Sequence, residues 1–143
     1  KGVGILMILS NRFFLHQALH RDDGTNKSYD EASELTYSGD GSRYAYAARS
    51  GNRGFIVLNG KEGPAFDRVV TPLFSPDGKY LVYRARQKGE RFVVVADAAS
   101  GRVLRRHPGY EQVFPVAFTA DGTSIAYGVK DRQQLIWNVE RLP

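Results

Sequence analysis

The sequence predicts an all-β protein, a β-propeller made of four-stranded antiparallel blades, with about three and a half blades in this chain. Three observations predict this fold. One pattern recurs in three segments, at offsets of 37 and 44 residues. The apolar runs are short and rich in branched and aromatic residues, and an Asp-Gly turn lies inside every copy. A period of about forty residues with four short strands is typical of a propeller blade.

Each copy begins with an aromatic residue followed by an acid, and an aspartate-glycine turn follows ten residues after the acid. These pairs are Tyr29-Asp30, Phe66-Asp67 and Tyr110-Glu111, and the turns are Asp40-Gly41, Asp77-Gly78 and Asp121-Gly122. An aspartate side chain binds nearby backbone amides and glycine accepts a positive φ, so we expect these residues to form hairpin turns.

The second strand of each copy carries a tyrosine and ends three residues later in a basic side chain. A polar loop follows at 50–54, 87–90 and 131–133, and a β-rich third strand at 55–58, 92–95 and 135–137. Another turn, at 59–63 or 98–101, precedes a more polar fourth strand. Helical repeats are excluded, because the apolar residues lack an i, i+3, i+4 pattern.

The amino-terminal residues fit the same frame, with strands at 4–9 and 12–17 and turns at 10–11 and 22–24. The apolar run of residues 3–9 is too short to span a membrane as a helix. No small-residue cleavage pattern follows it, so we interpret it as a buried strand rather than a signal peptide. We expect one domain with blade repeats at 1–28, 29–65, 66–109 and 110–143, the first lacking its first strand and the last its fourth.

The segment from Phe74 to Tyr83, with its Ser75-Pro76-Asp77-Gly78 turn, resembles the blade signature of the TolB-type, WD-repeat-like bacterial propellers. Equivalent segments at 38–41 and 119–122 extend the resemblance over most of the chain, with Gly39 in place of the usual proline. This resemblance implies a propeller fold and a periplasmic or secreted location. The same repeat also occurs in the propeller caps of prolyl-oligopeptidase-like peptidases, so it implies an architecture and no single function.

Composition limits the chemistry. The chain has no cysteine, which excludes disulfides, thiolate metal sites and a cysteine nucleophile. A formal net charge of +5 favours anionic partners electrostatically, although the basic residues are spread along the chain.

The basic strand ends are the candidate binding residues. Propeller symmetry would place Arg49, Arg86 and Lys130 at one radius on one face, where they could bind an anionic partner. Two alternatives stay open: the three side chains are solvated strand ends, or they pair with Asp30, Asp67 and Glu111.

No catalytic constellation is recognisable, and we expect neither an enzyme nor a cofactor. His16, His20 and His107 are expected to be surface or packing residues rather than metal ligands. The oxygen-rich segment 22–27 lacks the ligand spacing of a calcium loop and is interpreted as a turn. Tyr46, Tyr83 and Tyr127 are expected to pack between blades rather than to stack on bases.

The leading functional hypothesis is a non-catalytic protein-interaction scaffold. The alternatives are a fragment or accessory cap of a larger protein, such as a prolyl-oligopeptidase-like hydrolase, and a binder of an anionic polymer. An incomplete propeller leaves strand edges and apolar blade faces to be covered, so we expect self-association or a longer parent chain. Protein partners are favoured over nucleic acid.

Overall fold

The computed structural model describes residues 18–20 and 26–143, and these form strands and turns without a helix. A two-stranded antiparallel sheet comes first, made of β1 (Ala18–His20) and β2 (Asn26–Ser28). The strands predicted at 4–9 and 12–17 and the turn at 22–24 lie outside the described residues. No helix in the described part of the chain is long and apolar enough to cross a membrane.

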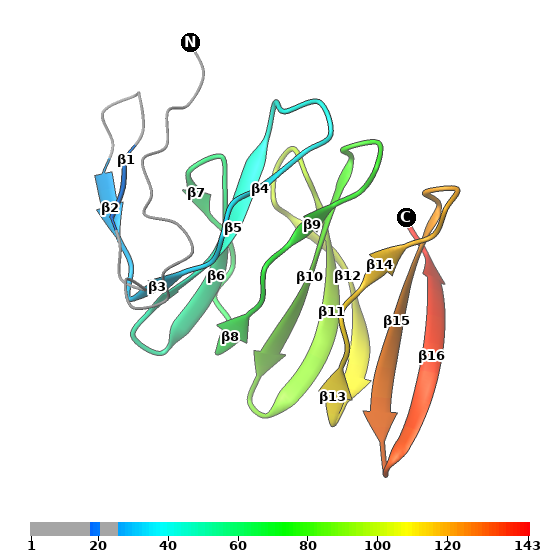
Figure 1. Ribbon diagram of the computed structural model, residues 1–143. Helices are drawn as coiled ribbons and strands as arrows, with labels where there is room; N and C mark the ends of the chain where they lie inside the picture. Colours follow the sequence, from blue (N-terminus) through cyan, green and yellow to red (C-terminus); the bar gives the residue numbers. More distant parts are fainter. Residues whose placement is uncertain (1–17, 21–25) are drawn as a thin grey trace.

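Three blades then follow in chain order and stand side by side (Figure 1). The second blade has the strands β3 (Glu31–Ala32), β4 (Thr36–Tyr37), β5 (Tyr44–Ser50), β6 (Arg53–Leu58) and β7 (Lys61–Glu62). The third has β8 (Arg68–Val69), β9 (Leu73–Phe74), β10 (Tyr80–Gln87), β11 (Glu90–Asp97) and β12 (Val103–Tyr110). The fourth has β13 (Gln112–Val113), β14 (Ala117–Phe118), β15 (Ser124–Asp131) and β16 (Gln134–Arg141).

The first strand of each blade is broken into two short ladders, β3/β4, β8/β9 and β13/β14. Pro72 and Pro115 lie between the two ladders of their blades, where proline has no N–H to donate. In the second blade the Ser33 hydroxyl accepts a hydrogen bond from the Ala47 N–H at 2.9 Å, in place of a backbone carbonyl. One backbone bond per blade still crosses the break, such as Val70 N–H to the Arg84 carbonyl at 3.0 Å.

Two of the hairpins at the lower edge in Figure 1 turn on two residues with positive φ, Lys88-Gly89 (φ 52° and 79°) and Arg132-Gln133 (φ 50° and 69°), whereas the hairpin between β5 and β6 has a positive φ at Gly51 (61°) but not at Asn52. Asn59-Gly60 (φ 49° and 84°) makes the same kind of turn between β6 and β7. The predicted turn at 59–63 is therefore too long: Lys61 and Glu62 already pair with Leu58 and Val57 as the fourth strand. Two residues are enough because positive φ at both matches the twist of the hairpin.

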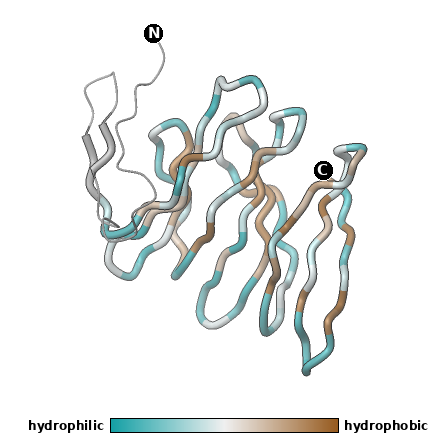
Figure 2. Tube along the Cα trace, in the orientation of Figure 1, coloured by the Kyte–Doolittle hydropathy of each residue, from teal (hydrophilic) through white to brown (hydrophobic). Residues whose placement is uncertain are grey.

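Hydrophobic residues are concentrated along the strands of the blades, and the loops at both edges are more hydrophilic (Figure 2). One buried cluster joins the second and third blades through Ile56, Leu58, Leu81 and Val94. Another joins the third and fourth through Val82, Val93, Ile125 and Val129. The third blade is thus apolar on both faces, which is how stacked repeats share one core.

Gly54 allows the second and third blades to approach closely. Its N–H and carbonyl exchange two hydrogen bonds of 2.7 Å with Phe66, the first residue of the next repeat. A Cβ at this position would lie 3.1 Å from the Arg68 Cα and from the Val69 nitrogen. Because those are backbone atoms, no other residue fits without displacing a strand.

Candidate functional site

Arg49, Arg86 and Lys130 occupy equivalent positions near the ends of β5, β10 and β15. Each carbonyl accepts the backbone N–H of the acid that starts its own repeat, at 2.8 Å from Asp30, 3.0 Å from Asp67 and 3.1 Å from Glu111. The adjoining hairpin loops lie along one edge of the blades in Figure 1. The three charges nevertheless have different surroundings.

Arg49 is ion-paired. Its Nη2 lies 3.3 Å from the Glu31 carboxylate and its Nη1 lies 4.0 Å from Asp30. The hydrogen bond to Glu31 raises the pKa of Arg49 above its ordinary value. Arg49 Nη1 also donates to the Gly51 carbonyl at 2.8 Å. Acidic partners from its own repeat therefore neutralise this arginine.

Arg86 lies in a row of arginines. It is the cross-strand partner of Arg68 on β8 and of Arg91 on β11, so three guanidinium-bearing side chains stand next to one another across three strands. Arg84, two residues before Arg86, lies on the same face of β10. Its Nη1 donates to the Val113 carbonyl of the fourth blade at 2.9 Å, and burial lowers its pKa. Lys130 is exposed on β15.

Four arginines border a cavity of about 80 Å³ between the third and fourth blades. Its lining consists of Arg68, Arg84, Arg86 and Arg91 with Val70, Ala85 and Val113. We call the four arginines and this cavity the arginine notch. Of its members, the sequence had indicated only Arg86. The other three could not be predicted without the cross-strand register. A two-residue turn at Lys88-Gly89 places Arg91 opposite Arg86, and the pairing of β8 with β10 places Arg68 opposite Arg86.

The acids of the aromatic-acid pairs secure the hairpin loops. Asp30 accepts the Gly51 N–H at 2.7 Å, and Asp67 accepts the equivalent Lys88 N–H at 2.7 Å. Both bonds join residues 21 apart in sequence, which preserves the repeat. These carboxylates are thus engaged within their own blades.

The Asp-Gly turns have the geometry of local hydrogen-bonded loops. Asp40 Oδ1 accepts the Ser42 N–H at 2.9 Å and the Ser38 hydroxyl at 2.8 Å, and Asp121 accepts the Thr123 N–H at 3.0 Å. These hydrogen bonds lower the pKa of Asp40 and of Asp121 to about 2, and backbone and Ser75 hydrogen bonds lower that of Asp77. Gly41, Gly78 and Gly122 have φ of 75°, 76° and 73°.

The repeated tyrosines Tyr46, Tyr83 and Tyr127 are buried, with 4%, 3% and 2% of their surface exposed. Tyr83 packs in the cluster between the second and third blades, and Tyr127 packs in the cluster between the third and fourth. Tyr46 and Tyr83 contact the repeat-starting aromatics Tyr29 and Phe66 edge-on, at 6.2 and 6.1 Å between ring centroids. The fourth blade differs, because Tyr110 has a positive φ of 55° and is exposed. His107 contacts Tyr127 in its place, at 6.3 Å.

The histidines provide little for metal binding. His107 lies 3.9 Å from Glu140, and its Nε2 is buried without a hydrogen-bond partner. His20 belongs to β1, whereas His16 and most of the segment 22–27 lie outside the described residues. Within the described ranges, no group of three histidine, aspartate or glutamate side chains could hold a metal ion.

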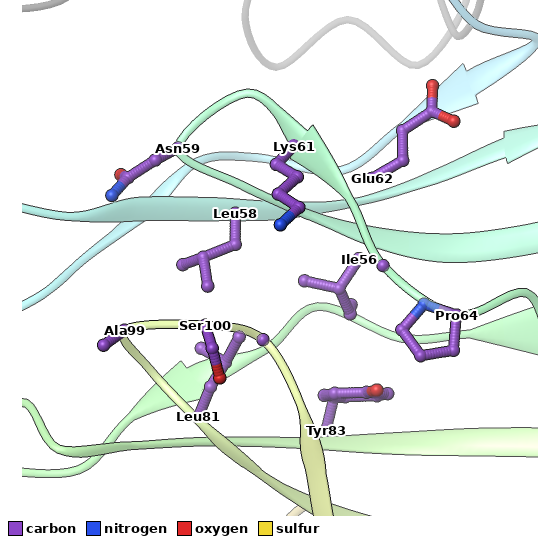
Figure 3. A pocket seen from close by; sticks show the side chains of 12 residues that line it. Ile56, Leu58, Asn59, Lys61, Glu62, Pro64, Leu81, Tyr83, Ala99 and Ser100 are labelled. Carbon is purple, nitrogen blue, oxygen red and sulfur yellow. The ribbon is translucent and has the colours of Figure 1, made fainter.

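A second cavity, of about 210 Å³, opens between the second and third blades (Figure 3). Ile56, Leu58, Leu81, Tyr83 and Pro64 give it an apolar interior, and Asn59, Lys61 and Ser100 lie at its margin. Nearby, the Tyr29 hydroxyl donates to Glu62 at 3.0 Å, and burial raises the pKa of Tyr29 to about 12. The cavity is smaller than a drug-sized ligand needs.

One face of β16 carries an exposed apolar row. Leu135, Trp137 and Val139 alternate along the strand, with 54%, 68% and 67% of their surface exposed. Tyr83 pairs with Val94 in the third blade, and the equivalent Tyr127 pairs with Asn138 in the fourth. The residues that precede these partners, Val93 and Trp137, are therefore equivalent. Val93 is fully buried against the next blade, and Val95, equivalent to Val139, is 1% exposed. We call Leu135, Trp137 and Val139 the outer face of β16.

No protein-family model and no curated protein sequence matches this chain. Several solved structures are similar to it. Hydrazine synthase from Kuenenia stuttgartiensis has 24% sequence identity, with a TM-score of 0.53 over 85% of this chain and 43% of that one. The propeller domain of the trilobed protease from Pyrococcus furiosus, described as having an open velcro topology, has 14% identity, with a TM-score of 0.61 over 85% and 44%.

TolB from Acinetobacter baumannii is 19% identical, with a TM-score of 0.57 over 98% of this chain and 40% of TolB. The predicted fold class, a partial β-propeller, and its fold-level resemblance to TolB-like propellers are therefore confirmed. The chain spans less than half the length of these three proteins. Similarity at this level shows the fold alone.

Proposed function

We propose that this chain is a non-catalytic protein-interaction scaffold, and that the outer face of β16 is its contact surface. The observation that carries the proposal is the contrast in exposure at equivalent positions. Ile56 and Val93 are 4% and 0% exposed beneath the following blade, whereas Trp137 is 68% exposed. Contiguous apolar side chains of this size on a surface are typical of contact sites.

The edge of β16 supports the same proposal. β6 and β11 each pair on both sides, with β5 and β7 and with β10 and β12. Within the described residues β16 pairs only with β15, which leaves one edge of an eight-residue strand open. An open edge beside an apolar face is a template for another sheet. The partner that fits best is therefore an apolar sheet face like that of a blade.

A second copy of this chain is the first partner to test. It supplies blade faces of the required chemistry, and two copies together would approach the length of the solved structures to which the chain is similar, of which it spans 43%, 44% and 40%. Removing large apolar side chains from water stabilises such a contact by about 25 cal/mol per Å² buried.

The test is the solution mass of the 143-residue chain, measured by light scattering coupled to size exclusion over a dilution series. We expect the mass of two chains for the wild type and of one chain for the double variant Trp137→Lys, Val139→Lys. Tyr37→Lys is the matched control, because Tyr37 is 56% exposed on β4 and lies outside the proposed surface, so this variant should keep the wild-type mass. A wild-type monomer at all concentrations would contradict self-association.

A second candidate function is that of a propeller part within a larger protein. It is supported by the short span of the chain relative to its structural neighbours, one of which is the propeller domain of a protease. In that case the 143-residue chain is a monomer, and the outer face of β16 becomes protected only when the encoded polypeptide continues into further blades. The same mass measurement therefore separates the two candidates.

A further inference from the structure

The arginine notch has an arrangement that works against folding. Arg68, Arg86 and Arg91 are directly opposed across β8, β10 and β11. Directly opposed side chains have Cβ atoms about 4.5–5.5 Å apart, and like charges in these positions are destabilising. Arg84, on the same face of β10, adds a fourth positive charge.

No acid among the described residues compensates these charges. None of the four arginines forms an ion pair within the part of the chain that the structure describes, whereas Arg49 at the equivalent position of the second blade contacts two carboxylates. The lining of the cavity contains no acidic residue. The contrast between the blades shows that the repeat can neutralise an arginine here, and that the third blade does not.

The walls of the notch favour an anion electrostatically. Val70, Ala85 and Val113 lie among the arginines, and Arg84, Arg86 and Arg91 are half-buried. Charge–charge attraction is stronger beside apolar walls than in open water, because the effective dielectric constant is lower. A cavity of about 80 Å³ admits one small group rather than a whole ligand.

We propose that Arg68, Arg84, Arg86 and Arg91 bind a single phosphate group inserted between the third and fourth blades. Guanidinium groups donate paired hydrogen bonds that match the oxygens of phosphate. A phosphate monoester carries about −1.5 to −2 charge at pH 7 and three acceptor oxygens, so it can engage more arginines at once than a single carboxylate. This site is separate from the outer face of β16 and does not depend on self-association.

The direct test is isothermal titration calorimetry of the whole chain with inorganic phosphate at low ionic strength. We expect saturable binding to the wild type and at least about a tenfold loss of affinity in Arg86→Gln, the centre of the row, because a charge-assisted hydrogen bond contributes about 1.5–3 kcal/mol. Arg102→Gln is the matched control: it makes the same charge change at an exposed turn outside the notch, and its affinity should equal that of the wild type. Absence of phosphate binding to the wild type, or an equal loss in both variants, would overturn the proposal.

Two further readouts test the chemistry of the site. In phosphate-free buffer Arg86→Gln should melt at a higher temperature than the wild type, since it relieves repulsion. Phosphate should raise the melting temperature of the wild type and of Arg102→Gln more than that of Arg86→Gln. Acetate should bind at least about tenfold more weakly than phosphate. Equal affinity for acetate would overturn the assignment to phosphate. An unchanged or lower melting temperature of Arg86→Gln would contradict the claim that the four arginines repel one another when no anion is bound.

Discussion

Arg132 and Gln133 form a hairpin turn in which both residues have positive φ, at 50° and 69°. The equivalent turn of the third blade uses Lys88-Gly89, so glycine occupies its second position. An L-residue in the left-handed region costs about 1–2 kcal/mol relative to glycine, which is offset in part by the greater flexibility of glycine in the unfolded chain. The fourth blade therefore carries avoidable strain in this turn.

Gln133→Gly should stabilise the protein by about 0.5–1 kcal/mol, seen as a rise of roughly 2–4 °C in melting temperature. The reverse change, Gly89→Ala, should lower stability by about 1 kcal/mol, since a Cβ there meets no atom within 4 Å and only the φ of 79° opposes it. Thermal unfolding followed by circular dichroism measures both. Destabilisation by Gln133→Gly would show that the glutamine side chain makes a contact more valuable than the relief of strain.

The sequence predicts the structural role of some residues and not of others. Asp40 and Asp121 were predicted to form turns, and their carboxylates accept the local hydrogen bonds that such turns require. The exposure of Tyr110 was not predictable, because its repeat position matches the buried Tyr29 and Phe66, and only its positive φ turns it outward. The arginine notch depends on cross-strand register, which no single residue encodes.

At the scale of elements, the contact between blades depends on backbone approach as well as on apolar packing. Gly54 on β6 exchanges two hydrogen bonds with Phe66 and lies against the backbone of β8. Strands can pack this closely only where a side chain is absent. The junction of the second and third blades therefore has a specific steric requirement.

Gly54→Ala should destabilise the protein by about 1–3 kcal/mol, because the added methyl group must displace backbone atoms that lie 3.1 Å away. Gly39→Ala serves as the control: the nearest atom is 3.7 Å from its Cβ position, and its stability should change by less than about 0.5 kcal/mol. Urea unfolding of both variants measures the difference. Equal stability of the two variants would mean that the junction adjusts without cost.

The sequence predicted the order of strands well and their extents less well. The third strand of the fourth blade was expected at 135–137, but β16 runs from Gln134 to Arg141. The polar Asn138 and Glu140 hid its continuation, since they alternate with the apolar residues of the outer face. The breaks in the first strands were also missed, although Pro72 and Pro115 marked two of them.

At the scale of the whole molecule, the three described blades share their apolar faces in series, and the outer face of β16 continues that series into solvent. A stack of repeats is stabilised by its interfaces, so an uncovered interface lowers both stability and solubility. We therefore expect another protein surface to cover this face, with a second copy of the chain as the first partner.

Trp137 is the single tryptophan of the chain and lies on the outer face of β16 at 68% exposure, so its fluorescence reports directly on that surface. The decisive measurement is acrylamide quenching of Trp137 emission over a dilution series of the 143-residue chain. We expect the indole to be protected and to emit at shorter wavelength at high protein concentration, and dilution to expose it. Full quencher access at every concentration would contradict the claim that a second copy covers this face.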